Sequence, residues 1–232
     1  MSKPQVTAQK PETVQKMFGE IAGSYDQFNG LMTLNQHQSW RKAALQAIGV
    51  RDGDRHLDLC CGTGDFLKAA TDQAEIAESV GIDFSAPMLE QARPKAPRAQ
   101  LLEGDVHTVP FENGRFSIVT VGWGLRNTAR PKDVMKEAAR VLEKGGRFAI
   151  LETAEPGKGI TGALTRWTFH TIVPIIGRLF GKGEAYSYLP ESTSRFMTRE
   201  EVLQAMRDAG FADARHRDLF FGNIALYWGA KS

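Results

Sequence analysis

The chain has 232 residues and a formal net charge of +2, with 42% hydrophobic and 24% charged residues. This length suits one α/β domain, and we expect a single domain over residues 1–232. The weak positive charge argues against nucleic acid as a partner, because nucleic-acid-binding proteins concentrate Lys and Arg on one stripe. The sequence shows neither the roughly twenty consecutive apolar residues of a membrane span nor the apolar core of a signal peptide, so we expect a cytoplasmic protein.

The N-terminal region carries helical patterns. Apolar residues recur at helical spacing between Val14 and Ile21 and predict a short amphipathic helix over residues 12–22. A polar and aromatic segment follows over residues 24–30, and a second helix is expected after it. We expect residues 12–48 as a whole to form a helical cover placed before the first strand.

The rest of the chain alternates between strand and helix patterns. Strands are predicted at residues 55–60, 79–83, 99–103, 116–122, 146–152, 212–219 and 223–229, and helices at residues 64–77, 86–93 and 131–143. This alternation predicts a parallel sheet with helices on both faces. Thr198 caps a further helix, and the short loop between the last two strands requires them to pair antiparallel. An α/β sheet of seven mostly parallel strands with an antiparallel C-terminal hairpin resembles the Rossmann-like fold of the class I methyltransferases.

The most informative segment is His56–Asp65, an apolar strand that runs into a glycine turn and then into a helix. Such a turn at the carboxyl end of a strand is typical of nucleotide sites. Asp83 ends the next strand, where an acid would hold a ribose diol. Leu67 stands where a dinucleotide fingerprint has its third glycine, which favours S-adenosylmethionine over NAD as the cofactor. The alternative is a tight strand-to-helix connection without a ligand.

The same turn contains both cysteines, Cys60 and Cys61. Two adjacent cysteines cannot cross-link distant parts of a fold, and neither a Cys-x-x-Cys motif nor a His pair accompanies them to bind zinc. We therefore expect reduced thiols and no metal site.

Three further segments carry a more specific pattern: Gly104–Phe111, Gly122–Asn127 and Tyr186–Ser192. Together with Ser24–Asp26 and Cys60–Asp65, they resemble the menaquinone/ubiquinone biosynthesis C-methyltransferases over nearly the whole chain. The resemblance implies an enzyme that uses S-adenosylmethionine to methylate a ring carbon of a polyprenylated quinol. The first candidate acceptor is demethylmenaquinol, and the benzoquinol of ubiquinone synthesis is the second.

Other functions stay open at this point. A methyltransferase of this fold could act on another small or lipidic acceptor, and a non-catalytic member could bind the cofactor within a quinone-synthesis assembly. An NAD oxidoreductase agrees least with the glycine pattern. One position departs from the family: Gly122 and Trp123 stand where the family often has Ser-Phe, so Gly122 offers the cofactor only backbone groups.

The glycine turn is expected to hold the methionine end of the cofactor. Gly62, Thr63 and Gly64 let the backbone approach this end, with amide donors toward its carboxylate. Asp58 is expected to meet the ammonium group through water, and the alternative is that it only ends the strand.

The nucleoside end is assigned to the next two strands. Asp83 is expected to accept hydrogen bonds from both ribose hydroxyls, the alternative being an exposed turn acid. By the resemblance, Asp105 meets the adenine amino group and the Val106 amide donates to the ring; the alternative is a surface turn.

Methyl transfer from a sulfonium depends on positioning and on exclusion of water. We hypothesise that Arg126 and Asn127 orient and stabilise the phenolate-like oxygen of the acceptor. Tyr25, in the cover, would hydrogen-bond the ring or relay its proton. Arginine stays protonated, so water or another group takes the proton. The alternative for Arg126 is a structural salt bridge with a helix acid.

Residues 156–190 interrupt the sheet pattern after the fifth strand and are expected to face the substrate or a membrane. Apolar residues form a stripe between Phe169 and Phe180, with basic residues mostly off it, which fits an anionic membrane or a prenyl tail. The alternative is an ordinary core-packing helix. We expect weak peripheral contact at the inner face of the plasma membrane, with a homodimer or a quinone-synthesis complex as further options.

Overall fold

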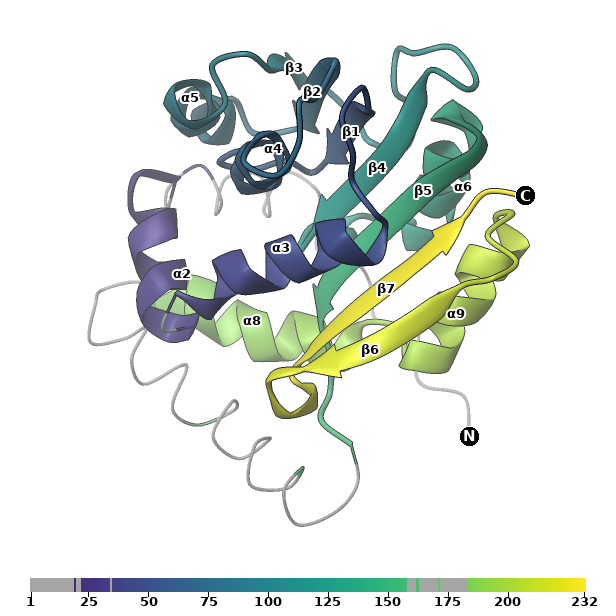
Figure 1. Cartoon of the computed structure of the whole chain (residues 1–232). Helices are drawn as coiled ribbons and strands as arrows, with labels where there is room; N and C mark the ends of the chain where they lie inside the picture. The colour runs from purple at the N-terminus through teal and green to yellow at the C-terminus, as the bar shows by residue number, and fades with distance from the viewer. Residues whose placement is uncertain (1–18, 20–21, 34, 158–161, 163–170, 172–182) are drawn as a thin grey trace.

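The computed structural model describes residues 19, 22–33, 35–157, 162, 171 and 183–232 (Figure 1). Seven strands form one sheet in the order β3-β2-β1-β4-β5-β7-β6. Their bounds are β1 Arg55–Leu59, β2 Glu78–Asp83, β3 Gln100–Glu103, β4 Phe116–Gly122, β5 Leu142–Thr153, β6 Arg215–Leu219 and β7 Ile224–Ala230. The predicted fold class is confirmed. Only β7 runs against its neighbours, since it pairs antiparallel with both β5 and β6.

The central strands are buried on both faces. Leu57 and Leu59 of β1 and Val119 and Val121 of β4 are fully inaccessible to solvent. Continuous burial of this kind is what a parallel sheet requires, because its crossover helices cover both faces. The apolar runs that predicted the strands therefore reflect two-sided packing.

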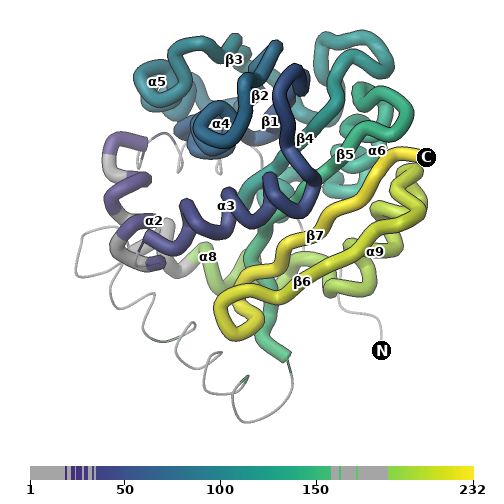
Figure 2. The backbone as a smooth tube through the Cα atoms, in the orientation of Figure 1, coloured from purple at the N-terminus to yellow at the C-terminus, as the bar shows by residue number. Residues whose placement is uncertain are grey.

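Helices lie in two layers against the sheet (Figures 1 and 2). One face carries α3 (Gln36–Ala47), α4 (Asp65–Thr71) and α5 (Ala86–Lys95), and the other carries α6 (Pro131–Val141) and α9 (Arg199–Asp208). Trp40 and Leu45 of α3 pack with Phe66 of α4 on the first face, whereas Val134 of α6 packs with Met206 of α9 on the second. The two apolar clusters hold the sheet between them.

The remaining described elements lie at the carboxyl ends of the strands or at the sheet edge. They are η1 (Ala22–Ser24), α2 (Tyr25–Thr33), η2 (Leu125–Asn127), α8 (Gly183–Arg195) and η3 (Phe220–Gly222). None of the helices among the described residues has both the length and the apolar character to cross a bilayer.

Several predicted boundaries differ from the observed ones. The helix predicted at 64–77 ends at Thr71, because the following backbone bonds instead to an earlier loop: Gly53 N–H donates to Glu75 O (2.9 Å) and Ala77 N–H to Asp54 O (2.9 Å). The fifth strand begins four residues earlier than predicted. The polar segment at 24–30 is helical: Ser24 ends η1, and residues 25–30 lie in α2.

Other predictions are confirmed or lie outside the described residues. Thr198 caps α9 through a capping box, in which its hydroxyl accepts from the Glu201 amide and the Glu201 carboxylate accepts from the Thr198 amide. The helix predicted at 12–22 and the apolar stripe predicted between Phe169 and Phe180 fall almost entirely outside the described residues.

Candidate active site

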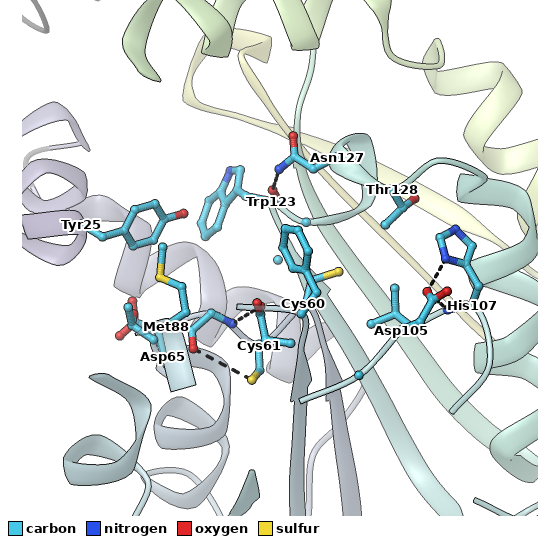
Figure 3. Close-up of a pocket in the computed structure, with 18 of the residues that line it drawn as sticks. Tyr25, Cys60, Cys61, Asp65, Met88, Asp105, His107, Trp123, Asn127 and Thr128 are labelled. Carbon is cyan, nitrogen blue, oxygen red and sulfur yellow. Dashed lines mark hydrogen bonds and ion pairs between the residues drawn. The ribbon is translucent and has the colours of Figure 1, made fainter. Parts of the chain in front are cut away.

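A cavity of about 390 Å³ opens at the carboxyl ends of β1, β2 and β4 (Figure 3). Ligands of open α/β sheets bind at this edge, where the strand order reverses. The lining comes from five regions: the cover (Tyr25, Arg41), the β1–α4 turn (Cys60–Thr63, Asp65), the end of β2 and start of α5 (Asp83, Phe84, Met88), the β3 loop (Gly104–His107), and the β4 loop (Gly122–Gly124, Asn127–Arg130).

The glycine turn forms the floor of the cavity. Gly62 has a φ of +52°, and a Cβ placed on it would meet nothing within 4 Å. Its backbone therefore faces open space, as close approach to a ligand requires. Gly64, the N-cap of α4, is not among the lining residues, so the structure gives it a place in the turn rather than at the cavity surface.

Cys60 is an unexpected member of this turn. It adopts a φ of +54°, a region that side chains other than glycine rarely enter. Its side chain occupies the space beside Gly124, where a Cβ would lie 2.3 Å from the Cys60 Cβ. Both cysteines are free thiols, and burial raises the pKa of each well above its ordinary value. They therefore act as neutral packing groups in the cavity wall.

Asp83 ends β2 and is 4% exposed. Its Oδ2 accepts from the Gly62 amide at 2.8 Å and its Oδ1 from the Ser85 amide at 2.9 Å. Burial raises its pKa to about 6, although these amide hydrogen bonds lower it in part. The Phe84 amide also lowers this pKa through a hydrogen bond, so a carboxylate with about four acceptor positions keeps capacity for one further donor from a ligand.

The N-terminal cover is tied to the glycine turn. The Thr63 hydroxyl donates to Asp26 Oδ1 at 2.7 Å and accepts from Lys95 Nζ at 2.9 Å. Lys95 also pairs with Asp26 (2.5 Å) and with Asp65 (2.7 Å). This cluster joins α2, the β1–α4 turn and the end of α5 at one side of the cavity.

Arg41 of α3 is a lining residue that the sequence reasoning missed. Its side chain is 7% exposed and pairs with Asp65 through Nη2 at 3.1 Å. The guanidinium carbon lies 4.7 Å from the centroid of the Trp123 ring. Among the described residues, its Nε has no hydrogen-bond partner. A basic residue directly after Trp40, on a helix with a buried apolar face, was the available signal.

Asp58 lies beneath the cavity and is not one of its lining residues. It is 2% exposed, and Thr120 Oγ1 donates to its Oδ1 at 2.6 Å. Because that hydroxyl gives its hydrogen to Asp58, it accepts from His56 Nε2 at 2.8 Å. Burial raises the pKa of Asp58 to about 7 and lowers that of His56 to about 4. The predicted contact of Asp58 with the ammonium stays a prediction.

Asp105, Val106 and His107 all line the cavity. Figure 3 shows the contact between Asp105 and His107. The Asp105 carboxylate accepts from the His107 amide at 2.9 Å and from its Nδ1 at 2.5 Å. Partial burial raises the pKa of Asp105, but these bonds outweigh it and the net shift is downward. His107 Nε2 accepts from the Arg130 amide at 3.2 Å, so the proton sits on Nδ1. This histidine, absent from the predicted set, links two loops of the cavity wall.

Packing explains why glycine stands at position 122, where the family often has serine. A Cβ on Gly122 would lie 2.7 Å from the Phe66 ring, closer than side chains can approach. Phe66 is 2% exposed and belongs to the apolar cluster of α3 and α4. The ring therefore occupies the volume that a serine at position 122 would need. Gly122 lines the cavity with its backbone alone, as the sequence predicted.

The catalytic candidates occupy different depths. Tyr25 and Asn127 line the cavity, whereas Arg126 does not. Asn127 Nδ2 donates to Trp123 O at 3.1 Å, and its Oδ1 accepts from Tyr188 Oη at 3.0 Å. Burial raises the pKa of Tyr25, with smaller opposing effects from Asn29 and from the charge of Arg126. Tyr25 is therefore a protonated donor at neutral pH.

The Arg126 guanidinium is buried behind the cavity wall. Its Nη1 lies 2.5 Å from Glu152 Oε1 and 2.7 Å from Trp123 O, and its Nε donates to Ser192 Oγ at 3.3 Å. The salt bridge considered for this residue therefore exists, with an acid of strand β5 rather than of a helix. The segments around Arg126 and Ser192, which carried the resemblance, meet here.

Comparison with known proteins decides the family. The model of the ubiE/COQ5 methyltransferase family matches residues 5–231. The chain belongs to the ubiE/COQ5 methyltransferase family. It is 36% identical over 226 residues to a demethylmenaquinone methyltransferase of Lactiplantibacillus plantarum (94% of this chain, 95% of the relative). It is 37% identical over 225 residues to one of Staphylococcus aureus (95% of this chain, 93% of the relative).

A solved structure agrees with the fold of this ubiE/COQ5 family member. A SAM-dependent methyltransferase of Thermotoga maritima superposes with a TM-score of 0.66 at 18% identity, covering 94% of this chain and 99% of that one. The predicted enzyme class, a methyltransferase that uses S-adenosylmethionine, is confirmed.

The residues present fit this cofactor on three independent observations. Asp83 keeps free acceptor capacity at the end of β2, and Gly62 turns a bare backbone toward the cavity. The buried guanidinium of Arg41 has an Nε that finds no hydrogen-bond partner among the described residues. The groups of S-adenosylmethionine that suit these residues are the ribose diol for Asp83, the methionine chain for the Gly62 backbone and the methionine carboxylate for Arg41.

Proposed function

We propose that this protein transfers the methyl group of S-adenosylmethionine to a ring carbon of demethylmenaquinol that carries a polyprenyl tail. The two demethylmenaquinone methyltransferases that it resembles over nearly their whole length support this acceptor. The observation that carries the proposal is structural: the Arg126–Asn127 and Tyr188–Ser192 segments, which carried the resemblance, meet at the cavity wall through two hydrogen bonds.

The cavity residues divide between the ends of the cofactor. Asp83 would hold the ribose hydroxyls, and the Asp105 and Val106 loop would meet the adenine. The Gly62 backbone would lie along the methionine end, with the Arg41 guanidinium at its carboxylate. When bound, the cofactor supplies a methyl group on a positively charged sulfur.

The acceptor oxygen would be held by the two catalytic candidates that face the cavity. Tyr25, protonated at neutral pH, donates to the oxygen as negative charge develops on it. Asn127 has one amide hydrogen left beyond its bond to Trp123 O, and it is oriented by Tyr188. Both side chains favour the phenolate-like form of the ring, in which the neighbouring carbon is the nucleophile.

Arg126 would act as a positioning residue. It fixes the carbonyl of Trp123, which in turn accepts from Asn127, and its charge lies close enough to Tyr25 to affect that residue's pKa. Since its guanidinium is held by Glu152, it acts on the acceptor through these neighbours. Water takes the hydroxyl proton of the quinol; once methylated, the ring carbon releases its own hydrogen as a proton to water and the ring oxygen is reprotonated, so one proton is released for each methyl group transferred.

The test is methyl transfer by the purified protein. Labelled S-adenosylmethionine is incubated with reduced short-prenyl demethylmenaquinol, with the corresponding demethylated benzoquinol, and with a phospholipid headgroup acceptor. We expect label in the naphthoquinol at a rate at least tenfold above the benzoquinol. Exclusive labelling of the benzoquinol would move the protein to ubiquinone synthesis, and label only in the headgroup acceptor would refute a quinol substrate.

The acceptor's tail also bears on location. A polyprenyl chain partitions into a bilayer, so the proposed reaction takes place where the protein meets the inner face of the plasma membrane. Oligomeric state and a quinone-synthesis complex remain predictions of the sequence.

A further inference from the structure

The turn between β6 and β7 exposes two adjacent phenylalanines. Phe221 is 78% exposed and Phe220 is 38% exposed, and they are the two large hydrophobic side chains most exposed among the described residues. Both have positive φ, 44° for Phe220 and 54° for Phe221. Bulky side chains avoid this region, and strained backbone of this kind clusters at functional sites.

The conformation of the turn is held by its surroundings. Arg199 of α9 donates through Nε to Asp218 Oδ1 (2.7 Å), through Nη2 to Gly222 O (2.8 Å) and through Nη1 to Glu155 O (2.8 Å). The Asn223 amide also closes the turn onto Phe220 O at 3.1 Å. Exposure of the Phe221 ring is therefore a property of a braced turn, and little conformational entropy is lost when the ring is buried by a partner.

An aromatic row connects this turn to the cavity. Ring centroids are 5.7 Å apart for Phe221 and Phe220, 5.4 Å for Phe220 and Trp40, and 6.3 Å for Trp40 and Trp123. Trp123 lines the cavity. The exposed turn is thus the outer end of a row of ring contacts that begins at the cavity.

Basic side chains lie along the strand that leads into the turn. Strand β6, at the edge of the sheet in Figure 1, reads Arg-His-Arg-Asp-Leu, with the first four residues exposed. Arg215 and Arg217 lie on the face of Leu219, which packs with the Trp40 cluster. Asp218, the only acid in the strand, pairs with Arg199. Charged side chains on an edge strand discourage pairing with another chain. That role accounts for the arginines but not for the exposed phenylalanines that follow the strand.

We propose that the Phe220–Phe221 turn inserts into the surface of an anionic lipid bilayer, with Arg215 and Arg217 against the headgroups. Aromatic rings beside cationic side chains match the two layers of such a surface, the acyl boundary and the phosphates. The inference rests on the proposed function in one respect: the lipid-soluble acceptor is drawn from the same bilayer. Adsorption to the bilayer itself requires no methyl transfer.

The test is partition of the purified full-length protein onto sedimenting vesicles, of phosphatidylcholine alone or with phosphatidylglycerol. Phe221→Asn removes the ring without backbone strain, since asparagine tolerates positive φ. Phe221→Leu is the matched control that keeps an apolar side chain. We expect about tenfold weaker partition for Phe221→Asn and at most threefold for Phe221→Leu, with thermal midpoints no lower than that of the wild type. Arg215→Gln/Arg217→Gln should abolish the preference for anionic vesicles.

Methyl transfer is measured in parallel with a water-soluble short-chain acceptor and with a vesicle-embedded one. Phe221→Asn should lower only the second rate. If no quinol is methylated but partition still depends on Phe221, the proposed function fails and the docking surface stands. Equal partition of Phe221→Asn and wild type, or no partition by wild type, overturns the docking surface. Loss of self-association in solution with vesicle binding unchanged also overturns it, in favour of a protein partner.

Discussion

The buried guanidinium of Arg126 and the buried carboxylate of Glu152 lie 2.5 Å apart, with side chains 6% and 0% exposed. Glu152 also accepts from the backbone amides of Arg126 (3.1 Å) and Thr153 (2.8 Å). The pair joins η2 to the end of β5 and so fixes the loop that presents Asn127 to the cavity. This structural role of Arg126 comes in addition to the positioning role that we propose for it.

Arg126→Ala should destabilise the protein by about 3–5 kcal/mol, because it leaves the Glu152 charge buried without a partner. The double variant Arg126→Met/Glu152→Met should recover most of this stability, since it removes both charges. Its kcat should stay at least tenfold low, while the dissociation constant for S-adenosylhomocysteine changes less than threefold. Thermal unfolding measures the stability, titration gives the dissociation constant, and steady-state kinetics give kcat. Wild-type kcat in the stable double variant would leave Arg126 a structural role only.

Arg41→Met should weaken binding of S-adenosylhomocysteine by about tenfold or more, the usual effect of losing a charge-assisted hydrogen bond. Arg41→Lys keeps the charge and should lose less affinity. Isothermal titration gives both constants, and decarboxylated S-adenosylhomocysteine is the second ligand. If Arg41 meets the carboxylate, the decarboxylated ligand should bind wild type and Arg41→Met equally. An equal loss for both ligands would place Arg41 elsewhere.

Gly122→Ser, which restores the residue often found in the family, should lower stability in this chain by about 1–3 kcal/mol, because its Cβ meets the Phe66 ring. Adding Phe66→Leu should return part of that loss. Thermal melts of the two single variants and the double variant measure the coupling. Additive effects would show that the two positions do not compete for the same space.

Asp58 should make stability depend on pH. Its pKa is raised by burial from 3.8 to about 7, so the folded state binds its proton more tightly than the unfolded chain. Its contribution to stability is full below about pH 4 and is lost as pH rises through 7. Asp58→Asn should lack this dependence of stability on pH. Asp83, whose pKa is also raised, is present in both the wild type and the variant, so its effect cancels in the comparison. Unfolding midpoints in denaturant from pH 4.5 to 8.5 would reveal it; parallel curves would contradict it.

The sheet was predictable because its signals are local. Alternating apolar runs and turns gave the seven strands in order, and the spacing from Gly62 to Asp83 gave the cavity floor, since neighbouring parallel strands end at the same edge. The capping box at Thr198 and Glu201 is likewise complete within four residues. Features of this kind need no knowledge of packing.

The missed residues depend on contacts between distant segments. Arg41 reaches the cavity because α3 crosses the sheet and brings it to Asp65, and His107 matters because it meets the Arg130 loop. The placement of Asp58 depends on Thr120, 62 residues away on the adjacent strand. No local periodicity encodes such pairings, so the sequence analysis left Arg41 and His107 out of the predicted site.

The bond from Thr63 to Asp26 spans 37 positions of the chain and connects α2 of the cover to the β1–α4 turn. One wall of the cavity thus belongs to the cover, so the shape of the site depends on this contact as well as on the sheet beneath it.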